Sequence, residues 1–509
     1  MKKEKLTANI LFSGIGCQER GFQNSNLFNL EVLNTSDICK ESVLSYAAIH
    51  CGLTNEMVEN YPDYPSREEM AKELTEINLG YEPEKDKHFD WSKLAKRKNK
   101  DLEKYWLANK LSHNLGDISR IEELPYADLW TCSFPCTDIS VSGKMKGLNP
   151  DSGTRSSLLW ENIRLLKKAR DNNISPKYIM FENVKNLVSK KFIADFNNLL
   201  EVLDELGFNS YWKVLNAKEC GIPQNRERVF VISIRKDIDK YAFDFPVPFD
   251  NGLRLKDILE EVVDEKYYLS DDKVEKFKKN FDIENIEISS NNPTRIGNVY
   301  GEQFGTGYAG NVWSKEGVSP ALMTMQGGGR QPHVVTGLVS NKGEKFEKQT
   351  DFANTLLARD YKGFGNQQMN CIVHIDDIRI RKLTPRECYV LMGLTFEDCD
   401  KAAEIGVTNT HLYKQAGNGI VTNCVELIAE HLYKAQYDNT YVCTDEKNGK
   451  FYESTVRVKS DYGKAYGAAM RGRYNPDGST SQNLELNGEE ISNTITTVGK
   501  DSFVVIRTK

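Results

Sequence analysis

Short apolar runs alternate with turns and helical stretches over the first half of the chain. The apolar run of residues 8–12 ends at a tight glycine turn, and a helical pattern starts at about Gln18. A second apolar run, residues 31–34, follows this helix and leads to Asp37. Strand, turn, helix and strand in this order predict a βαβ unit, in which the two strands lie parallel in one sheet.

Further apolar runs occur at residues 127–134, 178–181 and 229–234, and polar turn residues follow each of them. This alternation predicts an α/β fold, with a doubly wound, mostly parallel sheet in a first domain over residues 1–280. In such a sheet, ligands bind beyond the carboxyl ends of the strands. The side chains that follow each run are therefore the first candidates for a functional site.

Two segments interrupt this pattern. Residues 53–113 are rich in Lys, Glu and Asp, and we interpret them as a mostly helical, solvent-exposed insertion. Residues 281–378 are rich in Gly, Asn and Thr, which predicts a smaller, irregular, β-rich domain. Residues 379–435 then return to the first domain. Residues 436–509 form a C-terminal extension, and a weak repeat of strand-forming segments is either chance or a sign that this extension packs on the 281–378 domain.

Composition limits the class of protein. With 39% hydrophobic residues, a chain of 509 residues can bury a large core in more than one domain. The formal net charge of −6 argues against unspecific coating of nucleic acid. It leaves room for a DNA enzyme, because only the surface that faces the groove has to be basic.

The eleven cysteines include no CxxC pair, so we expect neither disulfides nor a metal site, and a reducing compartment fits. No apolar run approaches the roughly 18 residues that span a bilayer. The apolar piece at residues 10–12 is too short for the core of a signal peptide. We therefore expect a cytoplasmic protein without a membrane segment.

The glycine turn after the first run is the first candidate site. Gly14 and Gly16 let the backbone approach a nucleotide-like ligand, and Asp37 stands 21 positions after Gly16, where an acid can bind ribose hydroxyls. Glu19 occupies the position of the third glycine of the dinucleotide pattern. This substitution favours a nucleoside cofactor over a pyrophosphate and disfavours a nicotinamide oxidoreductase.

Cys136 is the second candidate. It follows the run of residues 127–134, and Pro135 fixes the turn so that the thiol points out of the sheet edge. Cys132, inside the run, is interpreted as a small buried hydrophobe. The glycine-rich stretch that follows, which carries Lys144 and Lys146, is expected to close over a substrate.

Polar residues at two further runs complete the pattern. Glu182 follows residues 178–181 and is either a ligand-binding acid at the same edge or a helix cap. Gln224, Arg226 and Arg228 alternate, so they share one face of an extended segment. Two guanidinium groups on this face suggest an anionic substrate, the alternative being a surface strand with salt bridges.

These residues, in this order, resemble the DNA cytosine-5 methyltransferase family. The resembling segments are residues 12–16, 37–38, 116–118, 134–136, 182–184, 224–228, 381–387 and 415–419. The resemblance implies a class I, Rossmann-like methyltransferase fold in which residues 281–378 are a target-recognition domain. It also implies S-adenosylmethionine as cofactor, S-adenosylhomocysteine as product and double-stranded DNA as partner.

The resemblance also implies roles for residues. Cys136 adds to C6 of a flipped cytosine, Glu182 contacts N3 and the 4-amino group, Arg228 binds the O2 edge, and Arg226 holds the site or a phosphate. The implied cofactor contacts are Phe12, Ser13, Gly14, Ile15, Gly16, Asp37, Ile38, Asp117, Ile118, Pro135, Asn418 and Gly419. The candidates for DNA contacts are Ser140, Lys144, Lys146, Gln224, Arg295, Arg330, Gln331, Arg359 and Lys362.

The chain departs from the family pattern at three positions. Thr137 stands where the family usually has glutamine, Asp37 replaces the commoner glutamate, and Ile38 replaces an often bulkier stacking residue. We expect these changes to tune loop contacts and cofactor affinity. An RNA cytosine-5 methyltransferase and an inactive DNA-binding module are the alternatives. The large 281–378 module favours DNA as substrate, and the joint retention of the catalytic side chains favours an active enzyme. We expect a monomer, with or without a cognate restriction endonuclease.

Overall fold

The computed structural model of the 509-residue chain forms two units, residues 1–452 and 453–509. It describes residues 3–82, 86–135, 139, 158–272, 274, 289–300, 310–323, 332–336, 379–441, 450–452, 465–474, 480–489 and 502–506. The second unit contains an antiparallel sheet in the order β15-β14-β16, with β14 at Ala465–Tyr474, β15 at Thr480–Glu489 and β16 at Ser502–Ile506.

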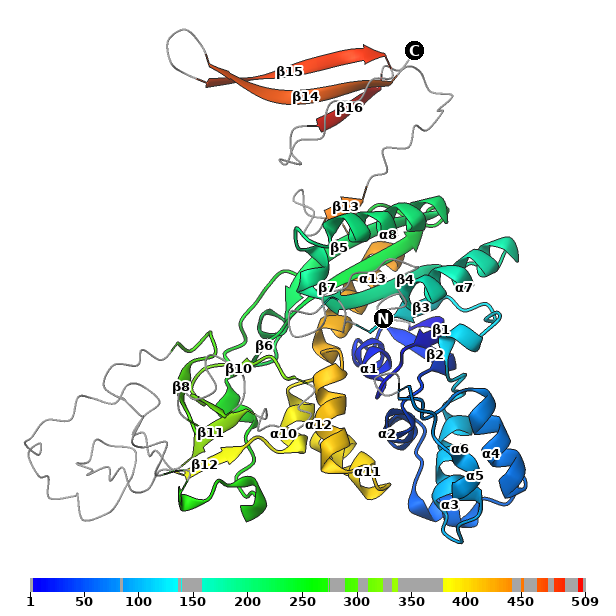
Figure 1. Ribbon diagram of the computed structural model, residues 1–509. Helices are drawn as coiled ribbons and strands as arrows, with labels where there is room; N and C mark the ends of the chain where they lie inside the picture. The colour runs from blue at the N-terminus through cyan, green and yellow to red at the C-terminus, as the bar shows by residue number, and fades with distance from the viewer. Residues whose placement is uncertain are drawn as a thin grey trace, which may run out of the picture. The chain divides into compact units, whose positions relative to one another are not determined.

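A seven-stranded sheet in the order β13-β5-β7-β4-β3-β1-β2 forms the centre of the first unit (Figure 1). Its strands are β1 (Glu4–Leu11), β2 (Phe28–Ser36), β3 (Leu129–Cys132), β4 (Tyr178–Val184), β5 (Phe208–Asn216), β7 (Glu227–Arg235) and β13 (Lys450–Tyr452). β2, β1, β3 and β4 are parallel neighbours, whereas β7 runs antiparallel to β4 and β5. The predicted doubly wound, mostly parallel α/β fold is confirmed.

Two hydrophobic cores cover the two faces of this sheet. Leu129 and Trp130, neighbours on β3, belong to different cores, as the twofold alternation of a strand requires. One core includes residues of α1 (Cys17–Asn24), α2 (Lys40–His50) and α13 (Thr422–Tyr437). The other includes residues of α7 (Leu159–Asp171) and α8 (Ile193–Glu205). A strand that is buried on both faces has a nearly continuous run of apolar residues. For this reason β3 and β4 could be predicted from the sequence.

The strands differ from the sequence prediction in several places, and two of these differences have a clear physical cause. β1 ends at Leu11, one residue early, because Phe12 takes a left-handed φ of 56° that no strand continues. β5 was missed because polar residues interrupt its apolar pattern. Ser210 is one of them. Its hydroxyl is hydrogen-bonded to that of Ser233 on β7 at 2.8 Å, so its burial leaves no polar group without a partner.

The insertion is helical, with α3 (Asn55–Asn60), α4 (Arg67–Glu76), α5 (Trp91–Ala95) and α6 (Asp101–Leu111). Our interpretation of it as solvent-exposed is wrong. Trp91, Leu102 and Leu107 are buried in the same core as the strands β1 and β4. The charged residues that dominate its composition lie on the outer faces of short helices, whose few apolar residues carry the packing.

Short strands form a second, smaller sheet in the order β12-β11-β9-β8. They are β8 (Arg295–Asn298), β9 (Asn311–Trp313), β11 (His333–Thr336) and β12 (Arg379–Lys382), and a separate pair joins β10 (Ser319–Pro320) to β6 (Gln224–Asn225). The remaining helices are α10 (Pro385–Val390), α11 (Phe396–Glu404) and α12 (Asn409–Asn418). Single 3-10 turns occupy Ile118–Arg120, Lys185–Val188, Ala217–Glu219, Leu255–Ile258 and Glu265–Tyr267.

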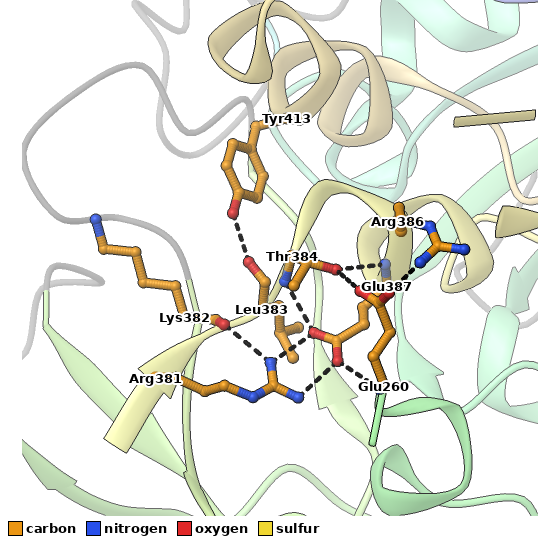
Figure 2. Close-up of polar contacts among 8 residues, drawn as sticks. All are labelled: Glu260, Arg381, Lys382, Leu383, Thr384, Arg386, Glu387 and Tyr413. Atoms are coloured by element: carbon orange, nitrogen blue, oxygen red, sulfur yellow. Dashed lines mark hydrogen bonds and ion pairs between the residues drawn. The ribbon is translucent and has the colours of Figure 1, made fainter. Parts of the chain in front are cut away.

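A buried ion pair joins the small sheet to these helices. Figure 2 shows Arg381 of β12 directed at the carboxylate of Glu387 on α10, with N–O distances of 2.8 and 2.7 Å. Thr384 caps α10, and Glu260 accepts hydrogen bonds from Thr384 and Arg386. Across the residues that the structure describes, helices of the length and apolarity that a membrane span needs are absent.

Candidate active site

The turns after β1 and β2 are joined by the carboxylate of Asp37. Its Oδ2 accepts a hydrogen bond from the backbone N–H of Gly14 at 2.9 Å, and its Oδ1 accepts one from Cys39 at 2.7 Å. The N–H of Ser13 also donates to the carbonyl of Ser36 at 3.1 Å. Gly14 and Gly16 have φ values of 55° and 81°, which only glycine adopts without strain. The predicted turn and its acid therefore lie together at the carboxyl edge.

Glu19 lies under this turn and is buried. Its carboxylate accepts a hydrogen bond from the hydroxyl of Tyr46, and Nδ1 of His50 lies 3.7 Å away. Nε2 of His50 contacts the carbonyl of Ile15 at 3.0 Å, and a Cβ on Gly16 would lie only 2.2 Å from this nitrogen. Burial lowers the pKa of His50, which favours the neutral ring. Glu19, which replaces the third glycine, thus supports the turn through its contact with His50.

The turn after β3 is held by a residue near the end of β4. Asn183 donates a hydrogen bond from Nδ2 to the carbonyl of Phe134 at 3.0 Å. Pro135 is the last residue described before a gap. The predicted site residues Cys136, Ser140, Lys144 and Lys146, together with Thr137, lie outside the described residues.

Two other thiols near this edge are poor nucleophiles. Cys132 ends β3 and Cys17 follows the glycine turn, and both are buried. Burial raises the pKa of Cys17 to about 12 and raises that of Cys132 further. Since the thiolate is the reactive form, neither of these two thiols is suited to act as a nucleophile.

Glu182 and Arg228 form an ion pair at the same edge. Nε of Arg228 lies 3.3 Å from Oε1 of Glu182, and the side chains are 20% and 10% exposed. Burial raises the pKa of Glu182, and the opposing effect of Arg228 and Arg226 is smaller. The pairing of β4 with β7 continues to Val184, so Glu182 lies inside β4 and not after it as predicted. A carboxyl group with a raised pKa is suited to donating a proton.

Arg226 faces the protein interior. Its guanidinium group donates to the carbonyls of Leu322 at 3.0 Å, Gly417 at 2.9 Å and Gly419 at 2.8 Å. Of the two expectations for Arg226, holding the site fits these contacts, whereas reaching towards an anion does not, because three backbone carbonyls of distant segments occupy the guanidinium group. A Cβ on Gly419 would lie 3.2 Å from Sγ of Cys17, so this arginine holds the loop of Asn418 and Gly419 against the glycine turn.

Gln224 is also internal, which corrects its assignment as a DNA contact. It is 0% exposed, donates to the carbonyl of Leu391 at 2.7 Å and accepts from the N–H of Leu322 at 3.1 Å. Arg295 is exposed on β8 and can meet a ligand. The other recognition candidates, Arg330, Gln331, Arg359 and Lys362, lie outside the described residues.

Residues 116–118, the third of the segments that resemble the family, lie beside the insertion and are called the third cofactor segment, as residues 37–38 are called the second. Asp117 caps the turn that starts with Ile118, accepting from the N–H of Ser119 at 3.0 Å and from its hydroxyl at 2.8 Å. The carbonyl of Ile38 accepts from the N–H of Gly80 at 2.7 Å. Sequence reasoning missed Asn183, although it stands next to Glu182, and it missed every contact from the insertion.

Comparison with known proteins identifies the class. Residues 76–434 match the family described as C-5 cytosine-specific DNA methylase, so the chain belongs to this family and is a DNA cytosine-5 methyltransferase. The family predicted from the motif order is confirmed.

Individual relatives share much of the chain. It is 35% identical over 429 residues to the Type II methyltransferase M2.ScrFI of Lactococcus lactis subsp. cremoris, covering 84% of this chain and 98% of that protein. It is 30% identical over 395 residues to the Orphan methyltransferase M.SPRI of Bacillus phage SPR, covering 63% of this chain and 86% of that one. The solved structure of the Entamoeba histolytica methyltransferase EhMeth aligns with a TM-score of 0.47 and 14% identity, covering 85% of this chain and 99% of that chain.

Proposed function

We propose that this enzyme methylates a flipped cytosine within a specific sequence of double-stranded DNA, with Cys136 as covalent nucleophile and S-adenosylmethionine as methyl donor. The observation that carries the proposal is the Glu182–Arg228 pair, a buried acid with a raised pKa beside a cation. It lies at the edge where β3 leads through Pro135 to Cys136. The substrate places the enzyme with the DNA of the cell, which supports a cytoplasmic location.

The residues at the edge fit a nucleoside cofactor. A Cβ built on Gly14 would meet no described atom within 4 Å, so the backbone of the turn is open on that side. Asp37 and Asp117 keep oxygen lone pairs for ribose hydroxyls and for an adenine amino group, because each oxygen can accept more than one hydrogen bond. Ile38, Pro135 and the loop of Asn418 and Gly419 complete the proposed pocket. When bound, S-adenosylmethionine supplies an electrophilic methyl group for C5.

The side chains activate a ring that is a poor nucleophile at C5. The Cys136 thiolate forms a bond to C6, which moves electron density to C5 and towards N3. Protonated Glu182 donates a hydrogen bond at N3, and Arg228 offsets the charge that develops at the O2 edge. After C5 is methylated and loses its proton, the S–C6 bond breaks and Cys136 returns to the thiolate. Base flipping is required because C6 is inaccessible within the stacked duplex.

The names of the relatives support a proposal for the biological setting. One is named a type II methyltransferase and one an orphan methyltransferase of a phage. We propose that this enzyme protects its own target sequence, as the partner of an endonuclease or as an orphan. The small sheet around β8, which carries Arg295, supports a role of residues 281–378 in choosing the sequence.

A covalent trap tests the nucleophile. Duplex DNA in which 5-fluorocytosine replaces the target cytosine should form a stable adduct with the wild-type enzyme, because fluorine cannot leave as a proton does. Cys136→Ala should form none in mass spectrometry, whereas the matched control Cys132→Ala should form it. An adduct that persists in Cys136→Ala, or disappears only in Cys132→Ala, would overturn the assignment.

A further inference from the structure

Residues 77–82 and 86–91 of the insertion, which the backbone hydrogen bonds between Glu82 and Lys87 join and which we call the hairpin, contact Asp117, the acid proposed to face adenine. The N–H of Asp117 donates to the carbonyl of Ile77 at 2.9 Å, and Nδ2 of Asn78 donates to Oδ2 of Asp117 at 2.7 Å. A Cβ on Gly116 would lie 2.0 Å from the carbonyl oxygen of Ile77, so the glycine is needed for this approach. Asn78 is only 7% exposed. The hairpin and the third cofactor segment therefore pack backbone to backbone.

The hydrogen bonds of the Asn78 side chain can run in only one direction. The carboxylate of Asp117 can only accept, so the amide nitrogen of Asn78 must face it. The amide oxygen then faces Nδ1 of His88 at 2.7 Å, and this nitrogen must carry a proton. The result is a chain of donors from His88 through Asn78 to Asp117. Ser119 binds the other carboxylate oxygen, so the plane of the carboxylate is fixed on both sides.

The hairpin itself is anchored. Nε1 of Trp91, a buried residue, donates to the carbonyl of Leu79 at 2.8 Å. The rings of Tyr81 and His88 stack at 4.7 Å and 28°. The N–H of Gly80 also donates to the carbonyl of Ile38 at 2.7 Å, on the second cofactor segment. The hairpin thus contacts both Asp117 and Ile38, the residue at the stacking position.

We propose that Asn78 and His88 are positioning residues of the cofactor site, which fix Asp117 to accept a hydrogen bond from the 6-amino group of adenine. The inference rests on the proposed function of Asp117. A fixed acceptor favours an amino group and repels the oxygen of a 6-oxopurine. Asn78 and His88, which belong to none of the eight motif segments, would thereby set the preference of this enzyme for adenine.

The test compares two ligands by calorimetry in the absence of DNA. S-adenosylhomocysteine carries the 6-amino group, and S-inosylhomocysteine carries a 6-oxo group in its place. The wild type should prefer the first by at least about tenfold, the equivalent of one hydrogen bond to a charged acceptor. Asn78→Gly should weaken the adenine ligand by about tenfold and leave the inosine ligand nearly unchanged. Glycine suits the φ of 57° at this position, so the variant removes the side chain without strain.

Further variants separate positioning from folding. Asn78→Asp, which places an acceptor against Asp117, should weaken the adenine ligand more than Asn78→Gly does. His88→Ala should lower the preference, and His88→Asn should restore it, because the amide nitrogen of asparagine takes the place of Nδ1–H. Asn55→Ala, in an exposed asparagine of the same insertion that donates to the carbonyl of Glu404, should retain the wild-type preference.

Each outcome bears on one proposal. If Asn78→Gly weakens both ligands equally, the side chain has a structural role only and the inference is wrong. A wild-type preference for S-adenosylhomocysteine that Asn78→Gly leaves intact also refutes it, while the proposed function stands. Failure of the wild type to bind either nucleoside would overturn the cofactor assignment itself.

Discussion

At the scale of single residues, the site depends on buried groups whose partners lie far apart in the sequence. Glu182 and Arg228 come from neighbouring antiparallel strands, and Arg226 reaches segments almost 200 positions away. Arg226 and Arg228 differ by two positions, yet one holds carbonyls of the interior and the other faces the proposed acid. Arginine can fill both roles because its planar guanidinium group donates in several directions.

Glu182 should cause the rate of methyl transfer to fall at high pH, which gives the pH profile a falling limb. Burial raises its pKa, so its protonated form persists to higher pH than an ordinary carboxyl group allows, and it is lost as pH rises through that raised pKa. A plot of kcat/KM against pH should therefore fall at high pH as Glu182 ionises. Glu182→Gln should lower the rate by about 100-fold and abolish the falling limb.

Methyl transfer to duplex DNA, measured across the pH range, checks this expectation. The control is Glu227→Gln, in a carboxylate that is 43% exposed and paired with Lys185, which should keep the falling limb. A falling limb that survives in Glu182→Gln would assign it to another group.

At the scale of elements, the success of prediction depended on how each strand is buried. β3 and β4 are covered on both faces and could be predicted from apolar runs alone. β5 could not, because residues such as Ser210 pair with polar residues of β7 and break the run. The insertion was misjudged since composition averages over its exposed and buried faces, whereas Trp91 and a few similar residues determine its packing.

The same limit applies to the candidate site. The acids Asp37 and Glu182 could be found because the ends of parallel strands meet at one edge. Gln224 and Arg226 were misplaced, since alternation tells which residues share a face but not what covers that face. Asn78 gave no signal, because its contact with Asp117 spans 39 positions and exists only after the insertion has packed.

The junction between β12 and α10 gives a prediction at this scale. The side chains of Arg381 and Glu387 are 1% and 0% exposed, so a lone charge left there would be poorly solvated. Arg381→Met should lower the free energy of unfolding by about 3–5 kcal/mol. The double variant Arg381→Met/Glu387→Gln should recover part of this loss, because glutamine keeps an acceptor for the backbone N–H of Thr384 without the charge.

Urea unfolding curves measure these changes. Lys72→Met, which removes an exposed pair with side chains 75% and 62% exposed, should shift the free energy by less than about 1 kcal/mol. A double variant less stable than Arg381→Met would show that the pair is not the source of the loss.

At the scale of the whole molecule, the main sheet ends in a strand from the C-terminal part of the chain. β13 pairs antiparallel with β5, with Phe451 opposite Tyr211, and the chain after Tyr452 forms a separate unit. The main sheet thus draws on the first half of the chain and on β13, and residues of α13 belong to a core on one of its faces. All of these elements belong to the first unit. Residues after Tyr452 share none of its sheets in the part of the chain that the structure describes.

Truncation separates these contributions. A chain of residues 1–452 should unfold at the same urea concentration as the full chain and bind S-adenosylhomocysteine with the same affinity, since both cores and the carboxyl edge are complete. A chain of residues 1–441 lacks β13, so the backbone groups of β5 that pair with it lose their partners. Each lost hydrogen bond should lower the free energy of unfolding by about 1 kcal/mol. Equal losses in the two truncated chains would instead place the stabilising contacts beyond Tyr452.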